Sequence, residues 1–354
     1  MENKSKRIII ITPGFPVDET DSTCIPFQQS LVLKWKEILP EFELIIFALQ
    51  YPYHNKPYKW RGFLIIPFGG RNQGGLNRFF LRQKIKVKLR HLHSEKKIDG
   101  CLSFWYNETA WAGNWMSKKY GIPHYCWLWG QDVKRENPYP TRLKLKSGEL
   151  LALSDFLQER MEEEHGIRPY KVIAPGVEAP VNSSVSRKRE YDLLGVGSLI
   201  PLKNYSVFIE TVVALKKTNS AIKALLIGTG HEKDKLELMI KTLGLENNLQ
   251  LAGERSHSEV LAAMENSKIL IHPSIYEGFG MVCLEAISCG MQVISFVQPM
   301  KRSVPGWHVV QDKMALSEKA TELLVEFDQL KSNNEFPLSA TISALAELFG
   351  SQTL

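Results

Sequence analysis

The sequence has no long hydrophobic run. Uninterrupted apolar stretches such as Ile8–Ile11 are far shorter than the roughly 18 residues that a membrane-spanning helix requires. Lys4, Lys6 and Arg7 precede that stretch, but residues 12–14 (Thr-Pro-Gly) end it too soon for the core of a signal peptide. We therefore expect a protein that neither spans a membrane nor is exported, and that resides in the cytoplasm.

Cysteine is scarce, and no two cysteines have the close spacing of a metal-binding or redox motif. The sequence holds five cysteines, an odd number, and no Cys-x-x-Cys: Cys24, Cys101, Cys126, Cys283 and Cys289. This pattern favours reduced thiols over a disulfide framework and argues against a zinc site. An Asp-x-Asp motif and any other obvious cluster of metal ligands are also missing, so no metal is expected.

Charge is distributed unevenly, although the overall composition is that of an ordinary globular protein. The 354 residues are 44% hydrophobic and 23% charged, with a net charge of +6. Residues 1–177 contain 27 basic and 18 acidic residues, whereas residues 178–354 contain 17 and 20. Most of the basic excess lies between Arg78 and Lys97, where eight basic residues accompany one acid, Glu95.

Short β-branched segments alternate with longer amphipathic ones along the whole chain. This alternation is typical of βαβ units around parallel sheets, and it predicts an α/β fold of two doubly wound domains. The clearest helix patterns are 206–217 and 232–243, and a last helix is expected over 338–349. The expected strands are 7–11, 44–48, 100–104, 124–128 and 171–174, followed by 192–196, 223–227, 249–251, 269–272 and 292–296.

A polar stretch rich in breakers separates the two series of strands and is interpreted as a linker. We predict an N-terminal Rossmann-like domain over 1–177, a hinge over 178–190 and a C-terminal Rossmann-like domain over 191–335. Residues 336–354 are expected to form a helical segment that crosses back to the N-terminal domain.

The segment richest in candidate chemistry runs from His272 to Ala286. It leaves a strand, crosses a turn with Gly278 and Gly280 and enters a helix, and such crevices bind ligands in open α/β sheets. Helix-start amides suit a phosphate, while Glu277 and Glu285 can reach different parts of one ligand. The alternative interpretation is a turn with two solvated glutamates.

A second glycine-containing turn, residues 195–204, also follows a predicted strand. Ile200 stands where the Rossmann fingerprint has its third glycine, which argues against a nicotinamide cofactor. Lys203, near the start of the next helix, could neutralise a diphosphate, and the alternative is a solvated surface lysine.

Together these segments resemble the retaining GT-B glycosyltransferases of family 4, also called glycosyl transferases group 1. The resemblance rests on Pro-Ser-x-Tyr-Glu-Gly-Phe-Gly-x-x-x-x-Glu-Ala over 273–286, on 197–204, and on 225–230, 251–254 and 172–177. It implies two Rossmann-like domains facing across a cleft. It also implies a UDP- or GDP-sugar as co-substrate, a glycan or lipid-linked acceptor, and no metal or other cofactor.

The resemblance assigns roles to individual residues. Glu277 would face the donor sugar, Lys203 would hold the diphosphate, and Glu285 would accept hydrogen bonds from the ribose. Glu277 and Lys203 are thus the catalytic candidates, and Gly253 would lie near the base. The remaining nucleotide-sugar candidates are Gly197, Ser198, Asn204, Gly228, Gly278, Phe279, Gly280 and Met281.

Two residues depart from the family pattern. Ser198 stands where an arginine is common, and Trp129, in Trp-Gly-Gln-Asp, stands where His-Gly-x-Asp is usual. A tryptophan can stack on a sugar face. The acceptor-side candidates are therefore Trp129, Asp132 and Asn107, and a non-catalytic protein that binds sugar nucleotide or glycan is the main alternative to an enzyme.

The basic segment 78–97 has an apolar stripe of Leu81, Ile85, Leu89 and Leu92 and is predicted to be helical, although 84–90 also alternates as a strand would. A basic amphipathic helix can dock on anionic lipid, so peripheral attachment to the inner face of the cytoplasmic membrane is one interpretation. A solvated helix face is the other. Nucleic acid is not an expected partner, because no recognition motif accompanies the charge.

Overall fold

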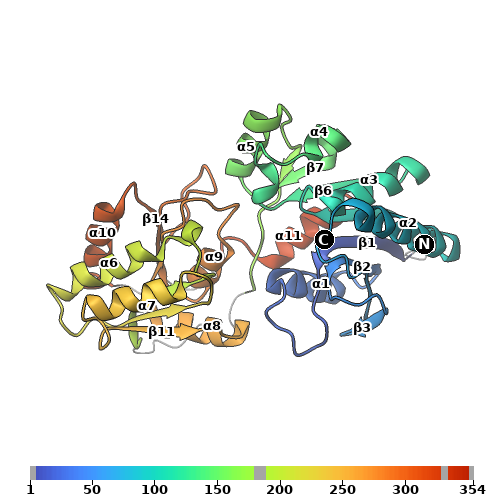
Figure 1. Cartoon of the computed structure of the whole chain (residues 1–354). Coiled ribbons are helices and arrows are strands. Elements are labelled where there is room, and N and C mark those ends of the chain that lie inside the picture. The colour runs from blue at the N-terminus through green and yellow to red at the C-terminus, as the bar shows by residue number, and fades with distance from the viewer. Residues whose placement is uncertain (1–4, 179–188, 328–333, 351–354) are drawn as a thin grey trace. The chain divides into compact units, whose positions relative to one another are not determined.

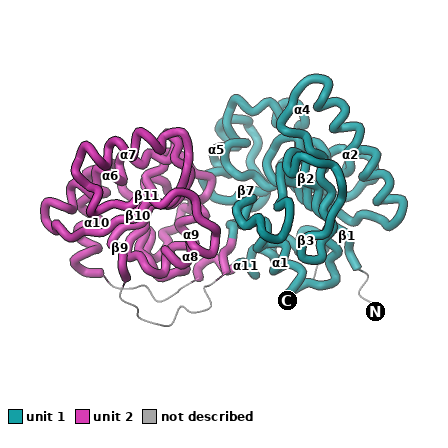
Figure 2. The backbone as a smooth tube through the Cα atoms, turned by 60° about the horizontal axis from the view of Figure 1, so that its bottom comes forward, with its two compact units in different colours: residues 1–175, 338–354 teal, residues 176–337 magenta. Residues whose placement is uncertain are grey.

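The computed structural model describes residues 5–178, 189–327 and 334–350, and these residues form two compact units. One consists of residues 1–175 and 338–354, and the other of residues 176–337 (Figure 2). Of the predicted hinge, residues 179–188 lie outside the described residues. No helix in the described ranges has the length and apolar character that crossing a membrane would require.

The sheet of the first unit is parallel except at one edge. Its strand order is β3-β4-β2-β1-β5-β6-β7-β8, and only β3 runs antiparallel to its neighbour. The chain moves outward from β1 to β2 and then crosses to β5, so the direction of winding switches between β1 and β5. The strands are β1 (Lys6–Gly14), β2 (Phe42–Tyr51), β3 (Tyr58–Trp60), β4 (Phe63–Pro67), β5 (Gly100–Phe104), β6 (His124–Leu128), β7 (Leu150–Ala152) and β8 (Lys171–Val172).

The helices of this unit lie around its sheet (Figure 1). In α2, the expected stripe of four aliphatic side chains is buried in the core beside β1 and β2. The whole segment is helical, because that stripe has helical spacing, so the strand alternative for 84–90 is wrong. The helices are α1 (Pro26–Ile38), α2 (Gly75–Glu95), α3 (Glu108–Tyr120), α4 (Tyr139–Leu143), α5 (Asp155–His165) and α11 (Leu338–Glu347), with short 3₁₀ turns η1 (Gln131–Val133) and η2 (Ser147–Glu149).

The last helix, α11, packs with the first unit, where it contacts α1. Just beyond it, Phe349 stacks edge-on against Tyr125 of β6, with ring centroids 5.4 Å apart. Lys6 of β1 donates to the carbonyl of Phe349 at 2.8 Å. The two ends of the described chain therefore belong to one unit.

The second unit has a fully parallel sheet of order β11-β10-β9-β12-β13-β14. Its winding switches between β9 and β12, the two central strands. The elements are β9 (Tyr191–Val196), η3 (Pro201–Lys203), α6 (Tyr205–Lys216), β10 (Ala224–Ile227), α7 (Lys233–Thr242), β11 (Leu249–Gly253), α8 (His257–Glu265), β12 (Ser267–His272), α9 (Met281–Ser288), β13 (Gln292–Ser295), β14 (Trp307–Val309) and α10 (Lys313–Val325).

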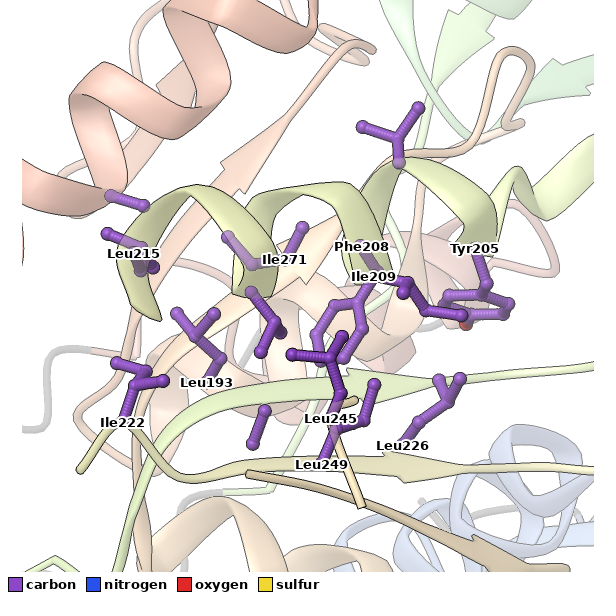
Figure 3. Close-up of a cluster of buried hydrophobic side chains, with 14 of the residues drawn as sticks. Leu193, Tyr205, Phe208, Ile209, Leu215, Ile222, Leu226, Leu245, Leu249 and Ile271 are labelled. Carbon is purple, nitrogen blue, oxygen red and sulfur yellow. The ribbon is translucent and has the colours of Figure 1, made fainter. Parts of the chain in front are cut away.

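The core of the second unit lies between this sheet and α6. Figure 3 shows Phe208 and Ile209 of α6 directed at the strands, where Leu193 and Leu226 rise from β9 and β10. These side chains are at most a few per cent exposed. The close packing of α6 holds the start of that helix, and the loop before it, in a fixed place above the ends of the strands.

Candidate active site

Three loops of the second unit are hydrogen-bonded to one another at the carboxyl ends of β9, β10 and β11. The amide of Gly197 donates to Ile227 at 3.0 Å, and the amide of Gly228 donates to Gly253 at 2.9 Å. A Cβ atom on Gly228 would lie only 1.9 Å from the carbonyl oxygen of Gly197. Only glycine therefore permits these loops to approach so closely, at the edge of the sheet where open α/β folds bind ligands.

The loop after β12 is attached to the loop after β9, across the switch point of the sheet. Leu202, in η3, accepts from the amide of Ile275 at 3.1 Å and from the hydroxyl of Ser274 at 3.2 Å. This attachment brings two predicted catalytic candidates together, because Lys203 Nζ donates to Glu277 Oε1. Both side chains are largely buried.

A histidine that the sequence did not single out completes this cluster. His272, the last residue of β12, is buried, and its Nε2 lies 3.1 Å from the same oxygen of Glu277. Burial lowers the pKa of His272 more than Glu277 raises it, so the ring is neutral at pH 7. For Glu277, burial raises the pKa, but the His272 hydrogen bond and the Lys203 charge outweigh burial and bring the pKa to about 2. The carboxylate is therefore ionised throughout the physiological range.

The first turn of α9 follows directly and contains no acidic residue. Gly280 precedes it in the left-handed region, with φ of 90°, which favours glycine. The first amides of a helix have no intrahelical partners and attract anions. The side chain of Phe279 points away from such a ligand, because it is buried against the rings of Trp307 and Phe336. Only its backbone can serve the role that the resemblance implies.

Glu285, in the second turn of α9, has a partner that the sequence did not reveal. Nε2 of His257, the first residue of α8, lies 2.9 Å from Glu285 Oε1. The hydrogen bond and the charge of Glu285 raise the pKa of His257 against the opposing effect of burial. The two carboxylates of the motif are thus each held by a histidine from another element.

The other predicted donor-side residues lie around these loops. Gly253 ends β11 with open space where its Cβ would be, and Ser198 is exposed after β9. Asn204 adopts a left-handed conformation, with φ of 54°, at the start of α6. The structure therefore gathers the predicted nucleotide-sugar residues at one edge of the sheet.

The first unit contains a polar cavity of about 110 Å³ at the carboxyl ends of β1, β2 and β5. Buried Glu108 accepts from Arg82 and from the hydroxyl of Tyr139, the latter at 2.6 Å. Asn107 lines the cavity with Glu108, and its Oδ1 caps α3 by accepting from the amide of Thr109 at 2.9 Å. This acceptor-side candidate thus lies at the switch point of its sheet.

The Trp-Gly-Gln-Asp loop is organised by its aspartate. Asp132 is buried and accepts from the backbone amides of Tyr106 at 2.8 Å and Gly130 at 2.7 Å. Burial raises its pKa in spite of these bonds. Asp132 therefore stabilises the backbone of this loop. The ring of half-buried Trp129 packs against that of Trp105, with the ring centroids 5.2 Å apart.

In the described residues, no group of three or more histidine, cysteine, aspartate or glutamate side chains is placed to hold a metal ion. The five cysteines are free thiols, four of them buried.

Two such parallel-sheet units define the GT-B class of fold, and comparison with solved structures agrees. The structure of HepE from Anabaena, in complex with UDP and glucose, superimposes with a TM-score of 0.69 over 98% of this chain and 100% of that one, at 18% sequence identity. Residues 178–334 match the model of the family described as Glycosyl transferases group 1. This match and the likeness of fold confirm the group 1 and GT-B parts of the resemblance inferred from the residue motifs.

Curated proteins match over part of their length. An uncharacterized glycosyltransferase of Methanocaldococcus jannaschii is 30% identical over 194 residues, which is 52% of each chain. A glycogen synthase of Mycobacterium tuberculosis is 25% identical over 177 residues, covering 49% of this chain and 43% of the other. The chain thus spans about half the length of these relatives or less.

Proposed function

We propose that this protein is a retaining, metal-independent hexosyltransferase that moves a sugar from a UDP- or GDP-sugar to a glycan or lipid-linked acceptor, in polysaccharide or surface glycan biosynthesis. The observation that carries the proposal is the cluster of Lys203, Glu277 and His272 at the switch point of the second sheet. It sets an ionised carboxylate and a cation beside a helix start that attracts anions.

The reaction explains why these residue types are needed. The bond between the anomeric carbon and the diphosphate oxygen breaks, an acceptor oxygen bonds to that carbon, and the acceptor proton passes to the departing diphosphate. Negative charge grows on the diphosphate, where Lys203 and the first amides of α9 stabilise it. Glu277 faces the positive charge that develops on the sugar ring.

The remaining donor contacts follow from the same placement. Glu285 accepts hydrogen bonds from the ribose hydroxyls, with its second oxygen available beside the one that His257 contacts. The base lies near Gly253, where the backbone has open space. Gly197, Gly228 and Asn204 shape the loops around the diphosphate.

The acceptor is assigned to the first unit. Its polar cavity offers carboxylate, amide and phenol groups for sugar hydroxyls, from Glu108, Asn107 and Tyr139. The half-buried ring of Trp129 offers a face on which a sugar ring can stack. The basic segment 78–97 supports peripheral attachment to the inner face of the cytoplasmic membrane.

Thermal shift against UDP-, GDP- and ADP-sugars tests the donor, followed by turnover of the sugar nucleotide that binds. Glu277→Ala should abolish transfer and leave nucleotide affinity largely intact, while the exposed Glu246→Ala serves as the matched control. Undiminished transfer by Glu277→Ala would refute the assigned role. Absence of both binding and hydrolysis with every sugar nucleotide would refute the proposed function.

The substitution of Trp129 for the usual histidine supports a second candidate, a non-catalytic protein that binds sugar nucleotide or glycan. Donor binding without turnover over a broad panel of acceptors would establish that candidate. If the protein is non-catalytic, Trp129→His, which restores the usual family residue, should still show no turnover.

A further inference from the structure

The outward face of α2 carries large apolar side chains that the first unit does not cover. Leu76 is 76% exposed, Phe79 55%, Phe80 57% and Val87 62%. Large side chains of this kind are normally buried, and a contiguous exposed group of them marks an interaction surface. We call this group the outer face of α2.

The outer face is not a misplaced core stripe. The stripe of α2 that includes Leu81, Ile85 and Leu89 is already buried against the first sheet. Leu76, Phe80 and Val87 are separated by four and seven residues, so they line up on one side of the helix, opposite that stripe. The helix therefore has two apolar faces, and only one has a partner in its own unit.

The basic side chains of α2 divide into two groups. Arg82 pairs with Glu108 and lies 4.5 Å over the ring of Trp111, while Lys86 lies 5.6 Å over the same ring. Arg90 lies 5.5 Å from the ring of Trp115. These three cations interact with a carboxylate or aromatic rings of their own unit. The positive charge available to a binding partner is therefore smaller than the net charge of segment 78–97.

Lys84 and Lys88 belong to the other group. Neither forms an ion pair with any residue in the part of the chain that the structure describes. Lys84, which is exposed, follows Phe80 by one helical turn and borders the outer face, and the half-buried Lys88 follows Lys84 by another turn on the same flank, nearer the buried stripe. The helix has one acidic residue, Glu95 in its last turn, which pairs with His91 at 3.2 Å.

We propose that the outer face of α2 docks on an anionic lipid bilayer. Leu76, Phe79, Phe80 and Val87 enter the boundary between headgroups and acyl chains, and Lys84 and Lys88 meet lipid phosphates. A helix that exposes large aromatic and aliphatic groups beside unpaired lysines, with no acid among them, has the chemistry of an interfacial membrane helix. This placement deepens the membrane part of the proposed function, and it requires neither donor nor acceptor.

Co-sedimentation with vesicles tests the inference on the full chain. The wild-type protein should bind phosphatidylcholine vesicles containing phosphatidylglycerol and should bind pure phosphatidylcholine far more weakly. Phe79→Ser/Phe80→Ser should weaken binding by on the order of tenfold or more, because two aromatic rings that would insert into the bilayer are lost. Lys84→Gln/Lys88→Gln should weaken it by about twentyfold at low salt and less at high salt.

Matched controls lie in the second unit. Leu238→Ser removes another apolar side chain that is 65% exposed, and Lys217→Gln/Lys241→Gln changes the net charge equally. Both should bind vesicles as the wild type does. Unchanged far-ultraviolet circular dichroism and melting temperature in all variants would show that they fold.

Three outcomes would overturn the proposal. The first is no binding of the wild type to anionic vesicles, and the second is equal binding by the two α2 variants and their controls. The third is self-association of the wild type in ultracentrifugation that Phe79→Ser/Phe80→Ser abolishes without any effect on vesicles, which would make the face an interface between copies. The thermal shift with sugar nucleotides tests the proposed function separately, so the two can fail independently.

Discussion

His272 and Glu277 are joined across the loop that follows the central strand β12, with Nε2 of the histidine 3.1 Å from Oε1 of the carboxylate. Lys203 donates to the same oxygen from the loop after β9. A neutral imidazole and a cation therefore orient one carboxylate, and removal of either partner should change its position before it changes the fold.

We expect His272 to act as a positioning residue for Glu277. His272→Phe should lower kcat by about tenfold, the cost of one hydrogen bond to a charged group, with a smaller effect on KM for the donor. His272→Gln retains an N–H donor and should recover much of the loss. Steady-state kinetics of the two variants measures this. Equal losses in both, accompanied by equal losses in melting temperature, would indicate a structural role only.

The pair of His257 and Glu285 should make stability depend on pH. The folded pKa of His257 is raised by Glu285, so the stabilisation is complete below the unfolded pKa of about 6.5 and is lost as pH rises through the folded value. Urea unfolding of the wild type and His257→Gln over this range provides the test. We expect the difference in unfolding free energy to shrink as pH rises, and parallel profiles would contradict the pair.

Glu277 should contribute in the opposite direction. Its folded pKa of about 2 lies below the unfolded value of about 4.3, so its stabilisation is present above pH 4.3 and is lost between there and pH 2. Glu277→Gln should therefore flatten the acid limb of the unfolding profile. An unchanged acid limb, measured with Glu254→Gln as control, would show that the carboxylate is not held as the structure has it.

Replacing Asp132 should destabilise the first unit. Its buried carboxylate satisfies backbone amides of Tyr106, Trp129 and Gly130. Asp132→Ala should cost on the order of 3 kcal/mol, because several buried donors lose their acceptor. Asp132→Asn keeps one acceptor oxygen and should cost less. A melting temperature unaffected by the alanine variant would contradict the role of Asp132 as organiser of this loop.

Gly228→Ala should disrupt the second unit. The added Cβ would meet the carbonyl oxygen of Gly197 at 1.9 Å, and the φ of 153° is unfavourable for alanine. A loss above about 4 kcal/mol is expected. Gly148→Ala, with no atom within 4 Å of its Cβ, is the matched control and should be neutral. Donor-induced thermal shift in both variants provides the measurement, and normal behaviour of Gly228→Ala would refute the close approach of the loops.

Local patterns were sufficient to predict much of the second unit. The strand expected at 269–272 and the glycine turn after it correspond to β12 and the start of α9, because buried strands and helix starts have strong local signatures. The short strands β3, β4, β7 and β14 were missed. They are three to five residues long, and their neighbours in the sheet rather than their own sequence stabilise them.

The site was predicted unevenly for the same reason. Glu277 and Lys203 could be named because each lies in a recognisable turn. His257 and His272 could not, since His257 stands 28 residues from Glu285 and His272 ends an otherwise apolar strand. Phe279, named for its place in the motif, has a side chain that packs into the core.

The sequence by itself determined the α/β class, the two series of parallel strands and the glycine turns that bring helix-start amides to the strand ends, because periodicity and glycine act locally. Only the tertiary structure decided which side chains meet. It placed one histidine beside each of the two carboxylates, and it buried one apolar stripe of α2 and left the other exposed. It also paired Arg82 with Glu108, whereas Lys84 and Lys88 form no ion pair among the described residues. Such contacts join residues far apart in the chain, so they depend on the packing of whole elements rather than on any pattern within one.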